Sequence, residues 1–273
     1  MVHTPGEASL DQIANWRPPP LISRAWLRRT LYALFMGYLV LALGSVEVNA
    51  DRLAEGLQRG GQFVAAFFSP DFFSHSEDIV QGLIESLTMT FAATVIGVLL
   101  SIPLALGAAS NISIPPVYYF CRGIIALSRS FQEIILAILF VAMFGFGPFA
   151  GLVTLVVATV GFFGKLLAED IEATHPEQVE AIRSTGAGWL QLMNYAVQPQ
   201  VMPRIVGLSL YRLDINFRES AVIGIVGGGG IGATLNTAFD RYEFDTAAAI
   251  LILIIAIVML AEYFSGLIRK RLR

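Results

Sequence analysis

The stretch Glu177-Gln-Val-Glu-Ala-Ile-Arg-Ser-Thr-Gly186 is polar, lies between long apolar runs and is followed by Pro199. Thr174 and Glu177 have the spacing of a capping box, and Pro176 suits a first helical turn, so the sequence predicts that a helix starts there. Gly186 is suited to the left-handed residue that ends a helix. The sequence therefore predicts a polar helix-turn-helix over residues 177–199, outside the membrane and accessible to a soluble partner.

The composition of this 273-residue chain excludes an ordinary soluble domain. Hydrophobic residues make up 55% of the chain and charged residues 14%. Soluble domains average about 45–50% apolar and about 25% charged residues. The composition therefore predicts an all-α polytopic membrane protein.

Six apolar runs are long enough for membrane-spanning helices, which need about 20 residues each. The predicted spans are Leu27–Val46, Gly82–Leu106, Pro116–Phe144, Leu152–Ala168, Met202–Ile225 and Thr246–Leu267. Basic residues cluster before the first span and after the last, which predicts that both termini are cytoplasmic. Counting through the spans places the loop 169–201 in the cytoplasm as well.

The loop between the first two spans, residues 49–78, contains an amphipathic pattern. Leu53 and Leu57 recur at helical spacing opposite Arg52, Glu55 and Arg59. This pattern predicts a helix that lies on the periplasmic membrane surface or packs against neighbouring spans. The run 69–71, Ser-Pro-Asp, is predicted to end it.

The third and fifth predicted spans carry charged and polar residues among apolar ones. Because a charge at mid-membrane costs about 2.5–3.5 kcal/mol, such residues usually face protein or water and mark a pathway. The candidate path residues are Ser128, Arg129, Ser130, Glu133, Asn216, Arg218 and Glu219. In the alternative, these charges neutralise one another: Arg129 would pair with Glu133 at i,i+4, and Arg212 and Arg218 would pair with Asp214 and Glu219. Arg122 and Arg204 are expected near the cytoplasmic ends of their spans.

A glycine-rich run follows the fifth span. It fits a G-x-G-x-x-G pattern, yet no βαβ unit surrounds it, so we do not expect a dinucleotide site. The run is predicted to form a close-packed turn near a periplasmic gate, or a purely structural re-entrant turn. The residues in question are Gly227, Gly228, Gly229, Gly230 and Gly232.

The spacing of Glu180-Ala181, Gly186 and Pro199 resembles the EAA loop of ABC-importer permeases, with departures at Ile182, Ala196 and Gln198. From about Glu85 onward the chain also resembles the phosphonate-type ABC permease family. The stretches that carry the resemblance are 85–90 (ESLTMT), 103–106 (PLAL), 128–130 (SRS), 145–151 (GFGPFAG), 184–187 (STGA), 216–218 (NFR) and 224–232 (GIVGGGGIG). The family usually has proline shortly after Arg129, where this chain has Phe131 and Gln132.

The resemblance implies a type I importer permease of the MetI-like fold in the bacterial inner membrane. Residues 1–26 would be a cytoplasmic tail and residues 27–273 the transmembrane permease domain. The loop would dock on an ATPase subunit through Glu177, Glu180, Ala181, Gly186 and Pro199. A second permease copy would complete the path, most simply as a homodimer, and a periplasmic binding protein would deliver the solute.

The resemblance also implies a transport role rather than catalysis, with phosphonate, phosphite or a related phosphorus oxyanion as solute. Guanidinium groups at Arg129 and Arg218 suit such an anion. The chain has no phosphate-binding G-x-x-x-x-G-K-[ST] loop, so ATP and Mg²⁺ are expected on the partner ATPase. The scattered histidines predict no metal site. The alternatives are a permease for another small solute such as methionine, a passive channel and an intramembrane enzyme, for which no clustered catalytic residues are present.

Overall fold

The computed structural model describes residues 24–45 and 50–271, and within these ranges the regular elements are all helices. This agrees with the predicted all-α class. The chain divides into two units, Met1–Arg59 and Gly60–Arg273.

The first unit contains α2 (Ala25–Ser45) and most of α3 (Ala50–Ala66), whose last residues belong to the second unit. α2 is long and apolar enough to cross a membrane. α3 is the helix predicted between the first two spans, and its apolar residues Leu53 and Leu57 are exposed. At the far end of α3, Phe63 packs against Phe239 and Phe244, with ring centroids 5.5 and 6.0 Å away. This end of α3 is therefore packed against protein.

The second unit contains three further helices that can span a membrane singly: α4 (Ser76–Ala108), α7 (Pro148–Glu172) and α12 (Phe244–Arg271). Two more candidate spans are bent pairs. One joins α5 (Pro115–Ser130) to α6 (Glu133–Phe144), and the other joins the helix Trp189–Gly228 to α11 (Ile231–Asp240) with a bend of 58°. With α2, the described residues hold up to six spans, the number that the hydropathy pattern predicts.

The predicted third span, Pro116–Phe144, is broken. α5 and α6 meet at 92°, and Phe131 and Gln132 between them are extended, with ψ of 139° and 146°. The prediction of one long helix was wrong here. Apolar residues on both sides conceal the break, because hydropathy reports composition and not backbone conformation.

Small residues let α4 and α7 pack closely along their lengths. A Cβ on Gly97 would lie 2.6 Å from Cβ of Thr159, so the two helices touch nearly backbone to side chain there. Other small buried residues of the pair include Ala93, Ala105 and Ala158. Close approach through small residues is how spanning helices associate where the lipid removes the hydrophobic driving force.

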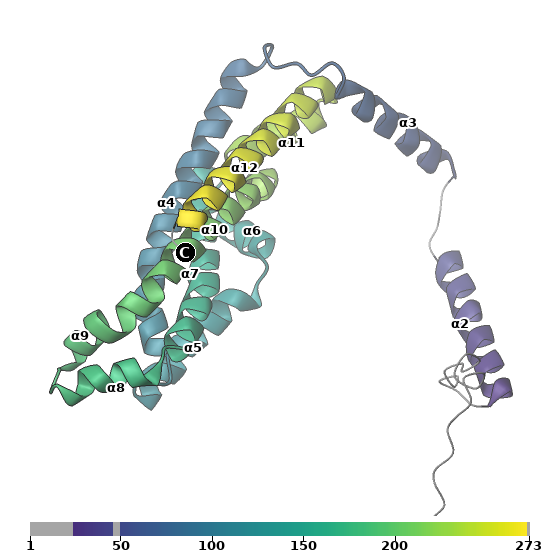
Figure 1. The fold of residues 1–273 in the computed structure, drawn as a ribbon. Helices are drawn as coiled ribbons and strands as arrows, with labels where there is room; N and C mark the ends of the chain where they lie inside the picture. Colours follow the sequence, from purple (N-terminus) through teal and green to yellow (C-terminus); the bar gives the residue numbers. More distant parts are fainter. Residues whose placement is uncertain (1–23, 46–49, 272–273) are drawn as a thin grey trace, which may run out of the picture. The chain divides into compact units, whose positions relative to one another are not determined.

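Figure 1 shows α8 (Pro176–Ser184) and α9 (Trp189–Leu192) at the opposite end of the second unit from α11. The loop 109–114 lies at the α8 end, because Asn111 donates a 3.0 Å hydrogen bond to the carbonyl of Ile171. The turn 145–147 lies at the α11 end, where Gly147 N donates to Gly227 O at 2.9 Å. Successive loops thus alternate between the two ends.

Candidate functional site

α8 exposes the residues predicted to meet a partner. It has no buried residue, and Glu177, Glu180 and Ala181 are all exposed. On the other side of the helix, Val179 and Ile182 are half-buried and pack against an apolar cluster formed by α4, α5, α7 and α10 (Gln198–Ile223). α8 is therefore fixed to the bundle by one face and presents the other to solvent.

The predicted left-handed stop of α8 is confirmed, whereas its predicted capping box is wrong. Gly186 has φ of +81°, which confirms the left-handed stop. The predicted capping box is absent, because α8 starts at Pro176 with His175 as N-cap and no side-chain cap. The Thr174 hydroxyl donates instead to the Ile171 carbonyl at 2.8 Å, one turn back. Thr174 thus finishes the preceding helix, which the spacing could not distinguish from starting the next.

Pro199 lies inside a helix and not at the exit of a loop. The helix Trp189–Gly228 runs through it, with a π-helical segment at Met193–Val197 just before. Proline has no N–H and crowds the carbonyl four residues back, so the wider π turn accommodates it. Gln200, which the motif analysis missed, accepts from His175 N (2.9 Å) and donates to Ala196 O (2.7 Å). Its side chain joins the start of α8 to the start of α10.

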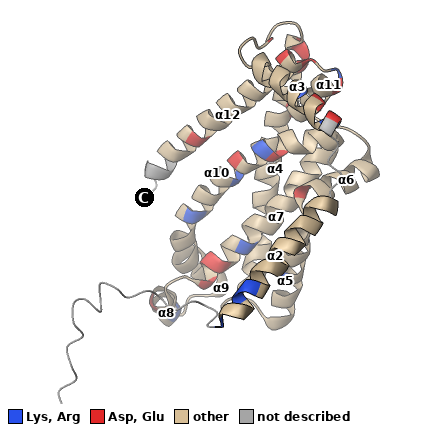
Figure 2. Ribbon diagram, turned by 90° about the vertical axis from the view of Figure 1, so that its right-hand side faces the viewer, with Lys and Arg blue, Asp and Glu red and all other residues tan. Residues whose placement is uncertain are grey.

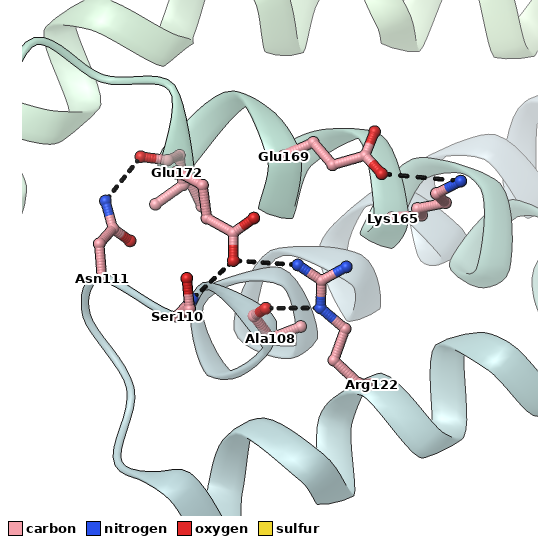
Figure 3. Close-up of polar contacts among 8 residues, drawn as sticks. Ala108, Ser110, Asn111, Arg122, Lys165, Glu169 and Glu172 are labelled. Atoms are coloured by element: carbon pink, nitrogen blue, oxygen red, sulfur yellow. Dashed lines mark hydrogen bonds and ion pairs between the residues drawn. The ribbon is translucent and has the colours of Figure 1, made fainter.

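A polar clamp, made by Glu172 and the groups that bind it, joins the helix ends beside α8 (Figure 3). Glu172 Oε1 accepts from Arg122 Nη2 at 3.0 Å and from Ser110 N at 2.7 Å. Arg122 Nε donates to Ala108 O at 2.9 Å, and Asn111 bonds the carbonyl preceding Glu172. The clamp therefore ties the last residue of α7 to the end of α4 and to the middle of α5. Arg122 was predicted near the end of its span, but it lies midway along α5, and its guanidinium reaches the ends of α4 and α7.

Arg122→Ala is expected to lower the stability of the bundle by about 1–3 kcal/mol, because it removes charge-assisted bonds from half-buried partners. Arg204→Ala is the matched control. Arg204 bonds Asp170 at 3.2 Å but is 60% exposed, so its loss should cost about 0–1 kcal/mol. Thermal unfolding of the purified protein in detergent measures both. Equal shifts for the two variants would contradict a special role for the clamp.

The break between α5 and α6 borders a cavity of about 320 Å³, whose lining includes Ser128, Arg129, Gln132, Glu133 and Phe162. Three predicted path residues thus meet in one cavity. Arg129 is exposed and makes no ion pair with the described part of the chain. The alternative pairing of Arg129 with Glu133 is wrong, because the break removes the helical i,i+4 geometry.

Glu133 pairs with Arg212 of α10 instead. Glu133 Oε1 lies 3.9 Å from Arg212 Nη2, and the Arg212 side chain is only 2% exposed. Arg212 Nε donates to Thr159 Oγ1 at 3.1 Å, and its guanidinium carbon lies 5.3 Å from the centre of the Phe162 ring. The sequence contained both charges but gave no signal that joined them across the fold.

Asn216, a predicted path residue, lies in a buried polar core. Its amide donates to Thr94 Oγ1 at 2.9 Å and to Thr159 Oγ1 at 3.0 Å, and its side chain is fully buried. These contacts join α4, α7 and α10. Asn216 therefore has a structural position apart from the cavity at the break.

The other predicted path residues, Ser130, Arg218 and Glu219, do not line the cavity. Arg218 pairs with Asp214 on the same helix, as the alternative interpretation predicts. Ser130 donates to Ala126 O at 2.8 Å and is exposed, and Glu219 is half-buried and interacts electrostatically with Glu133. Figure 2 shows charged segments at intervals along α10, whereas α12 is uncharged over most of its length.

The glycine run forms a close-packed turn, as predicted. Gly227, Gly229 and Gly230 have φ of +99°, +75° and +73°, which glycine adopts without strain. A Cβ on Gly229 would lie 2.7 Å from Pro148 N. Ser86 Oγ accepts from Ile231 N at 2.9 Å, so the turn is fixed to α4 as well. No cluster of metal-binding side chains occurs among residues 24–45 and 50–271.

Residues 97–273 match the family model described as "Binding-protein-dependent transport system inner membrane component". The phosphate-import permease protein PhnE of Mycolicibacterium smegmatis is 38% identical over 94% of this chain, which spans 48% of that relative's length. The phosphite transport system permease protein PtxC of Stutzerimonas stutzeri is 36% identical over 91% of this chain and 90% of its own.

Solved structures give the fold. An inward-facing structure of the MetNI methionine ABC transporter has a TM-score of 0.66 at 23% identity, covering 74% of this chain and 99% of that one. A bacterial alginate ABC transporter in complex with its alginate-bound periplasmic protein has a TM-score of 0.58 at 19% identity, covering 90% and 99%. At these identities the similarity establishes the architecture and not the solute.

Proposed function

Since this chain belongs to the family of binding-protein-dependent transport system inner membrane components, we propose that it imports a small phosphorus oxyanion such as phosphite or a phosphonate. The family match and the relatives confirm the prediction of an inner-membrane ABC permease, and the MetNI similarity confirms the predicted fold. The proposal concerns the solute, the arrangement of partners and the residues that act.

The solute proposal depends mainly on one observation. Arg129 lines a 320 Å³ cavity at the break between α5 and α6 and forms no described ion pair. A guanidinium without a carboxylate partner is suited to an oxyanion with several acceptor oxygens, because its planar donors can replace water on two of those oxygens. Several relatives carry phosphate or phosphite in their names, which agrees with this chemistry.

The proposed coupling surface is the exposed face of α8. Glu177, Glu180 and Ala181 would contact a separate ATPase subunit, which would bind ATP and Mg²⁺. Motion of α8 would reach α7 through the short link 173–175 that joins the two helices, and α10 through Gln200. Gly186 would allow the sharp stop, and Pro199 would maintain the π turn through which α9 continues into α10.

The proposed topology places the α8 end in the cytoplasm and the α11 end in the periplasm. Both chain termini would then be cytoplasmic, and the glycine turn 227–232 would lie near the periplasmic gate. A binding protein would deliver solute at this side. A second copy of the chain would complete the path as a homodimer, since one copy supplies up to six spans.

The solute is tested by uptake into cells that express the chain together with an ATPase subunit and a periplasmic binding protein of the same transporter. We expect ATP-dependent uptake of radiolabelled phosphite or methylphosphonate. Labelled phosphate and methionine are run in parallel. Uptake of methionine without any phosphorus compound would overturn the proposal, and transport without an ATPase would indicate a channel.

Arg129→Gln is expected to reduce uptake at limiting solute by roughly tenfold or more, because a hydrogen bond to a charged group contributes about 1.5–3 kcal/mol. Arg129→Lys keeps the charge but loses the planar fork, so its uptake should be intermediate. The amount of permease in the membrane is measured for each variant. Wild-type uptake by Arg129→Gln would show that the cavity does not contact the solute.

A further inference from the structure

The break in the third span places the N-terminus of α6 at the cavity, with Gln132 and Glu133 in the lining. Gln132 is the N-cap of α6, but no side chain caps the first-turn N–H groups. Free N–H groups and the helix dipole make such an end locally positive. Arg129 lines the same cavity, so two sources of positive potential face one volume of 320 Å³.

Arg212 supplies a third source behind the cavity wall. Its side chain is 2% exposed, and its Nη2 has no hydrogen-bond partner among the described residues. Glu133 and Phe162, two of the side chains next to its guanidinium, both line the cavity. A buried guanidinium N–H group without a hydrogen bond is costly, so Arg212 Nη2 is poised to donate to a better acceptor.

The existing partner is a poor one. Glu133 Oε1 lies 3.9 Å from Arg212 Nη2, too far for a hydrogen bond, and the Glu133 side chain is 31% exposed. Glu219, which is half-buried, also interacts electrostatically with Glu133 and Arg212. Of these charged side chains, Arg129 and Glu133 line the cavity, whereas Arg212 and Glu219 interact with Glu133 from outside the lining.

We propose that the cavity at the break is the transient anion site of the path, and that Glu133 is an internal counter-ion that the anion displaces from Arg212. The anion would contact Arg129 and the first turn of α6. As it arrives, Glu133 would turn away and one anion oxygen would take its place on Arg212 Nη2. When Glu133 returns, it would compete for Arg212 and expel the anion.

A displaceable carboxylate fits the needs of a transporter. Fixed positive charge alone would trap a phosphorus oxyanion, whereas conduction requires binding that is readily reversed. The balanced charges around the cavity keep the affinity low in the absence of delivery by a partner. This inference rests on the proposed function, because it assumes that the solute is an anion.

The first test is the Glu133→Gln variant of the permease, reconstituted with its ATPase subunits but without the binding protein. Removing one negative charge should increase phosphite affinity by about tenfold, since nearby charges interact strongly in such a site. Uptake measured with the binding protein should show a lower KM and a lower kcat, because release becomes slower. Glu262→Gln, an exposed position on α12, is the matched control and should change neither value.

Unchanged phosphite affinity in Glu133→Gln would overturn the proposal, as would a fall in affinity. A raised KM with unchanged kcat would also overturn it, because a merely structural Glu133 would weaken the site without slowing release. The double variant Glu133→Gln with Arg129→Gln should return affinity toward the wild-type value.

A second test does not depend on Glu133. Cys121 is the single cysteine of the chain and is buried. In a Cys121→Ser chain, a Gln132→Cys substitution places one exposed thiol in the cavity lining. Phosphite should slow its reaction with a charged methanethiosulfonate reagent, whereas methionine should not. The same thiol at Ser130, outside the cavity lining, should react at a rate that phosphite does not change.

Different results would overturn the anion site and the proposed function. If the transporter takes up phosphite but phosphite does not protect the thiol at position 132, the anion site is wrong and the proposed function stands. If the transporter takes up only methionine, the proposed function is wrong, and the site falls with it.

Discussion

Gly97→Leu is expected to prevent the permease from accumulating in folded form. A Cβ at this position would already lie 2.6 Å from two carbons of Thr159, and leucine adds three more carbons. Thr159 is fully buried and accepts hydrogen bonds from Arg212 and Asn216, so it has no room to retreat. Overpacking costs about 1–3 kcal/mol, and disruption of buried polar partners adds about 1–3 kcal/mol.

The measurement is the amount of monodisperse protein extracted from membranes, followed by its thermal unfolding. Gly123→Leu is the matched control, because Gly123 lies in the apolar helix α5 and a Cβ there would meet nothing within 4 Å. The control should be extracted at the wild-type level. Normal yield and stability of Gly97→Leu would show that α4 and α7 do not pack as described.

The polar core around Thr159 also shows where sequence reasoning stops. Hydropathy predicted the spans because each needs only a sufficient apolar length. Partners across the bundle have no such local signal: Asn216 and Thr94 are separated by 122 positions in the chain. Asn216 was therefore predicted as a path residue, although its contacts are those of a structural hydrogen-bonding group.

The break at Phe131 and Gln132 had a larger consequence. Helical periodicity offered the alternative that Arg129 and Glu133 neutralise each other, which requires that the helix continues. With a 92° bend, Glu133 meets Arg212 and Arg129 is left facing a cavity. A continuous helix would make Arg129 and Glu133 an internal ion pair, whereas the bend makes Arg129 part of a candidate anion site. This chain lacks the proline that the family usually has at this point, so no residue in the sequence signals the break. Residues of any type can break a helix when their backbone is extended.

The exposed helix α8 was more accessible to prediction. Its polarity between apolar runs and the glycine that ends it are local features of the sequence. The predictions drawn from them, an exposed helix and a left-handed stop at Gly186, are both confirmed. The position of Pro199 was not, because a proline next to a π turn can be carried inside a helix. Trp189 and Leu190 were also missed, although they are 54% and 69% exposed at the same end of the unit.

Glu180→Arg is expected to reduce ATP-driven uptake by tenfold or more while the permease remains inserted and folded. Glu180 is exposed and has no buried neighbour on its own helix, so the substitution should change stability by no more than about 0.5 kcal/mol. At an interface, a reversed charge replaces an attraction with a repulsion, and like-charge contacts cost several kcal/mol. Uptake, thermal unfolding and co-purification of the ATPase subunit are measured together.

Gln178→Arg is the matched control, because it adds a positive charge to the same helix. At 100° per residue, position 178 points about 160° away from Glu180. Gln178 is exposed, as Glu180 is, so an arginine there should not disturb the packing of α8 on the bundle. If the face that carries Glu180 docks on the ATPase, Gln178→Arg should retain most of its uptake and its ATPase. Equal loss in both variants would mean that added charge anywhere on α8 is harmful. Unchanged uptake in Glu180→Arg would remove this face as the coupling surface and leave the exposed Trp189 and Leu190 as the place to look for the ATPase contact.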